Sequence, residues 1–243
     1  PHKFLGGPGS SGVLIFDSSM YKAEVPDNPG GGTVDWTNAW GKYKYVDDIE
    51  AREDGGTPGF LEAIKAALAI ELKEKMGVKK MIAREKELLE IAFPGLRSIP
   101  GIKILADDIE DRLGVISFYH EKIHFNLIVK LLNDLFGIQV RGGCACAGTY
   151  GHFLLEVSYE KSMEITDLIN HGDLSRKPGW VRWSLHPTMR DEEVYYFIDG
   201  VKNIVENIDS YEKDYLYLKK KNEFIHRLEA ESETNDKIGR AHV

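Results

Sequence analysis

Apolar residues recur along the chain with the period of a helix in some stretches and of a strand in others. Within 60–76 an apolar residue falls at every fourth position, which predicts a helix whose apolar stripe faces a core. Pro58 lies near its start and Gly77 follows its end, as helix termini favour. Ahead of this helix, a glycine-rich turn at 6–12 runs into four apolar residues at 13–16, which predict a strand.

The rest of the chain alternates between helical and extended patterns. A second helix is expected over 79–92, ended by Pro94 and Gly95. Strands are predicted at 102–106, 115–119, 138–140 and 180–186, and helices at about 123–135 and 194–208. This alternation indicates an α/β domain over 95–210. A charged helical tail is expected over 211–237, and 238–243 continue no pattern and are interpreted as a non-native tail.

Composition and charge narrow the classes of function. Hydrophobic residues make up 42% and charged residues 29% of the 243 residues, a balance typical of folded, soluble proteins. The formal net charge of −8 disfavours nonspecific binding to nucleic acid or to anionic membranes. No apolar run approaches the roughly 20 residues that span a bilayer, and no signal peptide is evident. The only two cysteines, Cys144 and Cys146, are too close for an easy disulfide, and a reducing, cytoplasmic setting is expected.

The start of the chain carries the most informative motif. It reads PHKFLGGPG, so that Lys3 directly precedes a glycine-rich turn. A lysine that forms an imine needs rigid backbone and a pKa lowered from ~10.4, and glycines let backbone approach a bulky ligand. Two other interpretations are a solvated lysine in a flexible surface loop and a nucleotide phosphate loop. The order of residues argues against the phosphate loop, because in that motif the lysine follows the glycines.

His-Lys-aromatic followed by Gly-x-Pro-x-x-x-Gly and an apolar segment closely resembles the cofactor-lysine segment of class V aminotransferases and cysteine desulfurases, which use pyridoxal 5'-phosphate (PLP). The resemblance implies that Lys3 forms the Schiff base with PLP and that His2 helps to hold its phosphate. It also implies the α/β fold of PLP fold type I, with 1–94 as the C-terminal part of the PLP-binding large domain and 95–210 as the smaller domain. The N-terminal half of such an enzyme is expected upstream of Pro1, so this fragment alone is expected to be inactive.

A second motif, REDGGTP at 52–58, resembles the Glu-x-Gly-Thr-Pro turn that precedes a long helix in the same family. The resemblance implies that Thr57 reaches the PLP phosphate of a neighbouring subunit, and hence a homodimer with shared sites. Hydroxyl and amide donors at a helix N-terminus suit an anion. A simpler interpretation makes Thr57 a helix cap, and both roles are compatible.

The two cysteines lie in a third motif, RGGCACAG at 141–148. It resembles the Arg-x-Gly-x-x-Cys-Ala loop of one desulfurase group and is also similar to the molybdenum-cofactor sulfurase branch. The resemblance places Cys146 on the nucleophile position, where a thiolate attacks sulfur and becomes a persulfide. Two alternatives remain: Cys-x-Cys with His152 as the beginning of a metal site, or small loop residues in an aminotransferase. No metal site is expected, because a structural zinc needs four ligands.

The segment VRWSLHP at 181–187 reads as a strand with two different faces. Alternation puts Val181, Trp183 and Leu185 on one face and Arg182 on the other. A solvent-facing arginine is the simpler interpretation. However, Val-Arg-x-Ser followed by Thr-x-x-Asp-Glu-Glu resembles the small-domain segment of the same family, which implies that Arg182 binds the substrate α-carboxylate.

These motifs together favour a PLP-dependent enzyme that acts on an amino acid. The first hypothesis is a cysteine desulfurase-like reaction, with sulfur passed to a cysteine persulfide and alanine released. Alternatives are a class V aminotransferase without thiol chemistry and a PLP-free homologue with a binding role. The expected partners are an amino-acid substrate, with cysteine favoured, a second identical subunit and a sulfur-acceptor protein.

Overall fold

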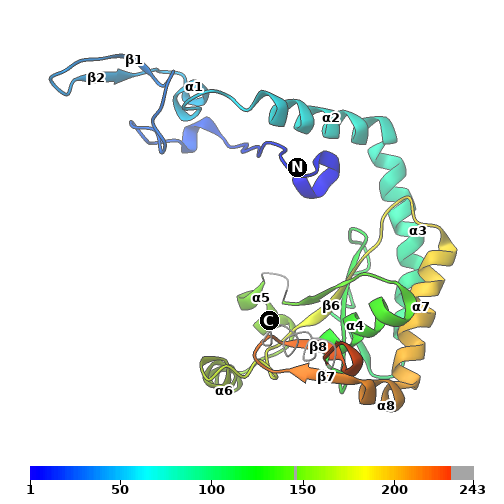
Figure 1. Cartoon of the computed structure of the whole chain (residues 1–243). Coiled ribbons are helices and arrows are strands. Elements are labelled where there is room, and N and C mark those ends of the chain that lie inside the picture. Colours follow the sequence, from blue (N-terminus) through cyan, green and yellow to red (C-terminus); the bar gives the residue numbers. More distant parts are fainter. Residues whose placement is uncertain (145–146, 231–243) are drawn as a thin grey trace, which may run out of the picture. The chain divides into compact units, whose positions relative to one another are not determined.

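The structure, a computed structural model, describes residues 1–144 and 147–230. The chain divides into two compact units, Pro1–Val78 and the part that follows from Lys79 (Figure 1). This division precedes the boundary expected between 94 and 95, because helix α3 (Val78–Arg97) buries its C-terminal half in the core of the second unit. The assignment of the units to a large and a small domain stays a prediction.

The first unit contains two helices, a β-hairpin and short turns. A π-helical turn (His2–Gly6) and a 3₁₀ turn (Ser18–Met20) precede strands β1 (Val34–Thr37) and β2 (Tyr43–Tyr45), which pair antiparallel, and helices α1 (Ile49–Glu53) and α2 (Phe60–Met76) follow. The helix predicted over 60–76 is therefore confirmed. It ends at Gly77, where φ is 86° and the N–H donates to the carbonyls of Lys73 and Glu74, a conformation that favours glycine.

Two expectations about the first unit are wrong. The small residues Ala66 and Ala69 are buried in α2, whereas the large apolar residues of its predicted stripe are exposed or half-buried. The predicted strand at 13–16 is absent, and Leu14 and Ile15 are 83% and 89% exposed. An apolar run forms a strand only when a neighbour pairs with its backbone, and no strand of the described residues does so here.

The second unit is built on a four-stranded antiparallel sheet of order β3-β4-β6-β5. Its strands are β3 (Ile102–Ile104), β4 (Val115–His120), β5 (Arg141–Gly143) and β6 (Trp180–Ser184). Three of the predicted strands are confirmed, whereas the strand predicted at 138–140 begins at Arg141 instead. The sheet thus puts β5 on an edge beside β6, directly ahead of the cysteine loop.

Helices α3, α4 (Phe125–Phe136) and α7 (Asp191–Glu206) share one hydrophobic core with this sheet. The core is dominated by fully buried side chains from all these elements: Leu88, Phe93, Ile116, Phe118, Leu131, Val181, Val194 and Phe197. Trp183 of β6 stacks on Phe197 of α7, with ring centroids 3.8 Å apart. The second unit also contains helices α5 (Gly148–Leu154), α6 (Tyr159–Asn170) and α8 (Ile208–Tyr211). No helix of the described residues is long and apolar enough to cross a membrane.

Helix α3 continues through Pro94, where the sequence predicted its end. Proline removes one backbone donor, but Phe93 and Leu96 on either side are buried in the core, and their burial outweighs that loss. Gly95 lets α3 approach α7, since a Cβ at this position would overlap the Cδ1 atom of Ile198. Close packing of the two helices therefore explains Gly95, and burial of its neighbours explains why the helix continues through Pro94.

The helical tail expected from residue 211 is also wrong over most of its length. After a 3₁₀ turn (Glu212–Asp214), strands β7 (Tyr215–Leu218) and β8 (Glu223–His226) form an antiparallel hairpin. The sequence of β7, Tyr-Leu-Tyr-Leu, is rich in aromatic residues, which favour strands. The part of the expected tail from 231 onward lies outside the described residues.

Candidate functional site

The turn that carries Lys3 is fixed against the start of α2. Lys3 and His2 are exposed in the π-helical turn, which contacts α2. The Ser11 N–H donates to the carbonyl oxygen of Glu62 (3.1 Å), and Lys65 Nζ donates to the carbonyl oxygen of Pro8. These contacts hold the glycine-rich segment to the first turns of the helix and leave the Lys3 amine accessible.

Thr57 lies exposed just ahead of α2. The N-cap of α2 is Gly59, so the interpretation of Thr57 as a helix cap is wrong. Two other residues of the same motif have structural contacts: Arg52 lies 5.1 Å from the ring centroid of Tyr21, and the Tyr21 hydroxyl donates to Glu53. The first residues of the motif, Arg52 and Glu53, thus contact Tyr21, whereas the hydroxyl of Thr57 is accessible to a ligand.

Strand β6 has the two faces that the sequence predicted. Val181, Trp183 and Leu185 are 0%, 3% and 5% exposed, whereas Arg182 on the opposite face is half-buried. The Nε atom of Arg182 is fully buried and has no hydrogen-bond partner among the described residues. A buried donor without an acceptor costs about 1–3 kcal/mol, and an anionic ligand would remove that cost.

Arg141 is the residue that the sequence motifs left without a role. In the register of β5 and β6 it is the direct partner of Arg182, and both line an open pocket of about 500 Å³ together with Ser184. The carboxylate of Glu193 lines the same pocket. The two arginines and the buried Nε of Arg182 make this pocket a candidate site for an anionic group. The sequence signals that could have found it are its place as the first residue of the RGGCACAG motif and its position directly after a predicted strand.

The cysteine loop is described only at its ends. Cys146, the predicted nucleophile, lies outside the described residues, and Cys144 is a half-buried free thiol directly after β5. His152, the third residue of the alternative metal site, has contacts at both ring nitrogens. Its Nδ1 lies 2.9 Å from the carbonyl oxygen of Gly148 within α5, and its Nε2 lies 2.9 Å from Ser162 Oγ in α6. The described residues contain no group of three metal-binding side chains, and Cys146 is not among them.

The predicted site residues fall into two groups, one in each unit. His2, Lys3 and Thr57 belong to the first unit, and Arg182 and the cysteine loop belong to the second. The first group offers an amine, an imidazole and a hydroxyl beside glycine backbone. The second offers a guanidinium with an unsatisfied donor.

Comparison with known proteins gives one consistent result. The family model of the class V aminotransferases matches residues 1–197. A probable cysteine desulfurase from Staphylococcus epidermidis is 33% identical over 147 residues, which are 60% of this chain and 34% of that protein. A probable cysteine desulfurase from Staphylococcus aureus is 31% identical over the same shares. The chain thus spans about a third of the length of these curated relatives.

Solved structures agree on the fold. The apo structure of a cysteine desulfurase from Thermococcus onnurineus NA1 is similar with a TM-score of 0.56 and 25% identity, over 75% of this chain and 40% of that chain. A cysteine desulfurase from Escherichia coli gives a TM-score of 0.54 at 18% identity, over 74% of this chain and 39% of that chain. The second likeness shows the fold alone.

Proposed function

The chain belongs to the class V aminotransferase family, and from this premise we propose that it carries part of a PLP-dependent active site that removes sulfur from cysteine and releases alanine. The observation that carries the proposal is the buried, unpartnered Nε of Arg182 opposite Arg141, because it suits the carboxylate of an amino acid. The names of the relatives favour desulfuration over amino transfer.

The donors of the first unit fit the functional groups of PLP. Lys3 has an exposed amine for the aldehyde, and His2 and Thr57 provide an imidazole and a hydroxyl for the phosphate. When bound, PLP supplies an electron sink for the carbon framework of the substrate. The exposed hydroxyl of Thr57 is accessible to a second subunit, and we place the phosphate contact there, in a homodimer.

Arg182 orients the substrate through its carboxylate. The guanidinium is a planar fork that matches a carboxylate with two parallel hydrogen bonds. Arg141, its partner across the strands, adds a second positive charge at the same place. Orientation of the substrate brings its sulfur to the attacking thiol and contributes to the rate in that way.

Cys146 accepts the sulfur. Its thiolate attacks the substrate sulfur, a sulfur–sulfur bond forms, and the carbon–sulfur bond breaks with its electron pair moving to the carbon side. The carbon then takes up a proton, which yields alanine, and Cys146 holds a persulfide. A thiol of ordinary pKa, about 8.5, is ionised only in part at neutral pH, so the step needs a cationic group near the thiol.

The test uses the full-length protein with PLP and cysteine, and measures alanine together with the protein-bound persulfide. Desulfuration predicts both products in the wild-type protein, loss of both in Cys146→Ser, and persulfide on Cys146 in the matched control Cys144→Ser. Alanine formation that persists in Cys146→Ser would contradict the thiol step. Amino exchange that depends on a keto acid and is unchanged in Cys146→Ser would instead establish an aminotransferase.

A further inference from the structure

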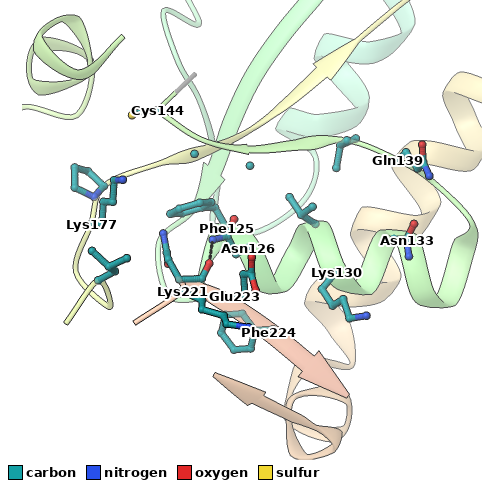
Figure 2. Close-up of a pocket in the computed structure, with 17 residues that line it drawn as sticks. Phe125, Asn126, Lys130, Asn133, Gln139, Cys144, Lys177, Lys221, Glu223 and Phe224 are labelled. Atoms are coloured by element: carbon teal, nitrogen blue, oxygen red, sulfur yellow. Dashed lines mark hydrogen bonds between the residues drawn. The ribbon is translucent and has the colours of Figure 1, made fainter. Parts of the chain in front are cut away.

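A groove runs across the second unit beside the cysteine loop (Figure 2). It encloses about 680 Å³, with α4 as its floor, β5 as one wall and the turn between β7 and β8 together with β8 as the other wall. We call it the α4–β5 groove. The residues that matter for its chemistry are Asn126, Asn133, Gly142, Cys144, Lys177 and Lys221.

The wall formed by the hairpin is held in place by hydrogen bonds to its surroundings. Asn126 Nδ2 of α4 donates to the carbonyl oxygen of Asn222, and the Tyr215 hydroxyl donates to Asp134 Oδ2 of α4 (2.9 Å). The Leu174 N–H donates to the carbonyl oxygen of Lys219 (3.0 Å). Because both sides of the hairpin are anchored, the groove exists without a bound partner.

The opposite wall, strand β5, exposes mainly backbone atoms to the groove, because two of its three residues are glycines. Gly142 lies so close to α4 that a Cβ would be 2.5 Å from Asn126 Oδ1, and Gly143 follows it. Strand β5 is an edge of the four-stranded sheet, and β8 belongs to the separate two-stranded sheet. A groove between two strands suits an extended segment, since such a segment can pair with backbone and place alternate side chains on either side.

Charge distinguishes one end of the groove. Lys177 and Lys221 line the groove and are labelled on the same side of it as Cys144 in Figure 2, and both lysines are exposed. Neither forms an ion pair within residues 1–144 and 147–230, in contrast to Lys130, whose Nζ lies 3.1 Å from Asp134 and 3.4 Å from Glu229. The groove also carries one carboxylate that forms no ion pair with the described residues, Glu223 of β8. In a chain of net charge −8, two lysines against this single carboxylate leave a local excess of positive charge that favours a ligand with several carboxylates.

We propose that the α4–β5 groove binds an extended, acidic segment of a partner protein, with its carboxylates at Lys177 and Lys221. The segment lies between β5 and β8 and passes Cys144, two positions before Cys146 in the sequence. We identify this partner with the protein that accepts the persulfide sulfur, and this identification rests on the proposed function. The binding of an acidic segment in the groove does not depend on the proposed function.

The experiment measures fluorescence anisotropy of a short fluorescein-labelled peptide of alternating glutamate and valine, with the full-length protein. We expect saturable binding that weakens with salt. The double variant Lys177→Glu/Lys221→Glu should lose at least about tenfold in affinity, which corresponds to about 1.4 kcal/mol. The matched control is Lys79→Glu/Lys80→Glu, which changes the same charge at exposed lysines outside the groove, and its affinity should equal that of the wild type.

Two further measurements distinguish binding in the groove from nonspecific electrostatic attraction to the protein surface. Asn133→Trp fills the exposed part of the floor and should weaken binding without a change of charge. A lysine–valine peptide should gain affinity for Lys177→Glu/Lys221→Glu, which shows that this variant is folded. The proposal is overturned if the glutamate peptide does not bind, if the control variant loses as much as the groove variant, or if single-stranded oligothymidine binds the groove in preference. The assay involves no turnover, so its failure leaves the desulfurase test untouched.

Discussion

Arg141 and Arg182 face each other across the pair of strands β5 and β6. Both side chains line the same open pocket, and the buried Nε of Arg182 has no acceptor among the described residues. The second unit has other buried nitrogens without a partner, in Trp180 and His124, but of these three residues only Arg182 lines this pocket. Such a local cost is typical of a binding site.

Replacement of Arg182 tests its role toward the substrate. In the full-length enzyme, Arg182→Lys keeps the charge but loses the fork, and we expect kcat/KM for cysteine to fall by roughly tenfold to a hundredfold, as for loss of about 1.5–3 kcal/mol of charged hydrogen bonding. Arg182→Ala should lose more. The control is Arg176→Lys, the same exchange at an exposed arginine that does not line this pocket. Steady-state kinetics measures the effect, and equal losses in the control variant would contradict the assignment.

Gly95 tests the packing of α3 on α7. A Cβ at Gly95 would overlap Ile198, so Gly95→Ala should destabilise the second unit by about 1–3 kcal/mol through overpacking. Helix propensity alone predicts the opposite sign, because alanine stabilises a helix interior by about 1 kcal/mol relative to glycine. Urea unfolding measures the change. The double variant Gly95→Ala/Ile198→Val should recover part of the loss, and a stabilised single variant would contradict the close approach.

The buried position of His124 leads us to expect that the stability of the second unit depends on pH. Its ring stacks on Phe125, and its Nδ1 accepts the N–H of Asn126 at the start of α4. Burial lowers the pKa of His124 below 6.5. The unfolded chain therefore binds a proton near pH 6.5 that the folded chain binds only at lower pH, so this contribution to stability is complete above pH 6.5 and is lost as the pH falls through the folded pKa.

The measurement is the urea midpoint between about pH 7.5 and about pH 5. His124→Asn retains an N-cap side chain for α4 and removes the titration, so its midpoint should fall less over this range than that of the wild type. Burial also lowers the pKa of His120, and this contribution is common to both proteins. Equal slopes in the two proteins would show that His124 is solvated.

Features of the second unit that depend on residues within a single strand or helix could be predicted from the sequence. The alternation of Val181, Trp183 and Leu185 gave the buried face of β6, and Gly137 ends α4 in the left-handed conformation that it favours. The candidate residues Lys3 and Arg182 came from motifs, but the role of Arg141 needed the register of two strands. The register of β5 against β6 is set by the pairing of two segments that are distant in the sequence. The sequence of one strand alone does not determine this pairing.

The wrong expectations share a physical cause. In each case the structure of a segment depends on its contacts with other segments of the fold. The apolar residues at 13–16 lack a paired neighbour among the described strands. Pro94 remains helical because Phe93 and Leu96 are buried. The region after 211 forms a hairpin that is held to α4 through Tyr215 and Asp134. Tertiary contacts override local propensity in all three cases.

Covalent attachment of PLP to Lys3 is the most direct test of the account. The full-length protein is incubated with PLP, reduced with borohydride and digested, and the modified peptide is identified by mass spectrometry. We expect PLP on Lys3, no adduct in Lys3→Ala, and an unchanged adduct in Lys65→Ala, which removes the neighbouring amine that donates to Pro8. An adduct on another lysine, or none in the wild-type protein, would contradict it.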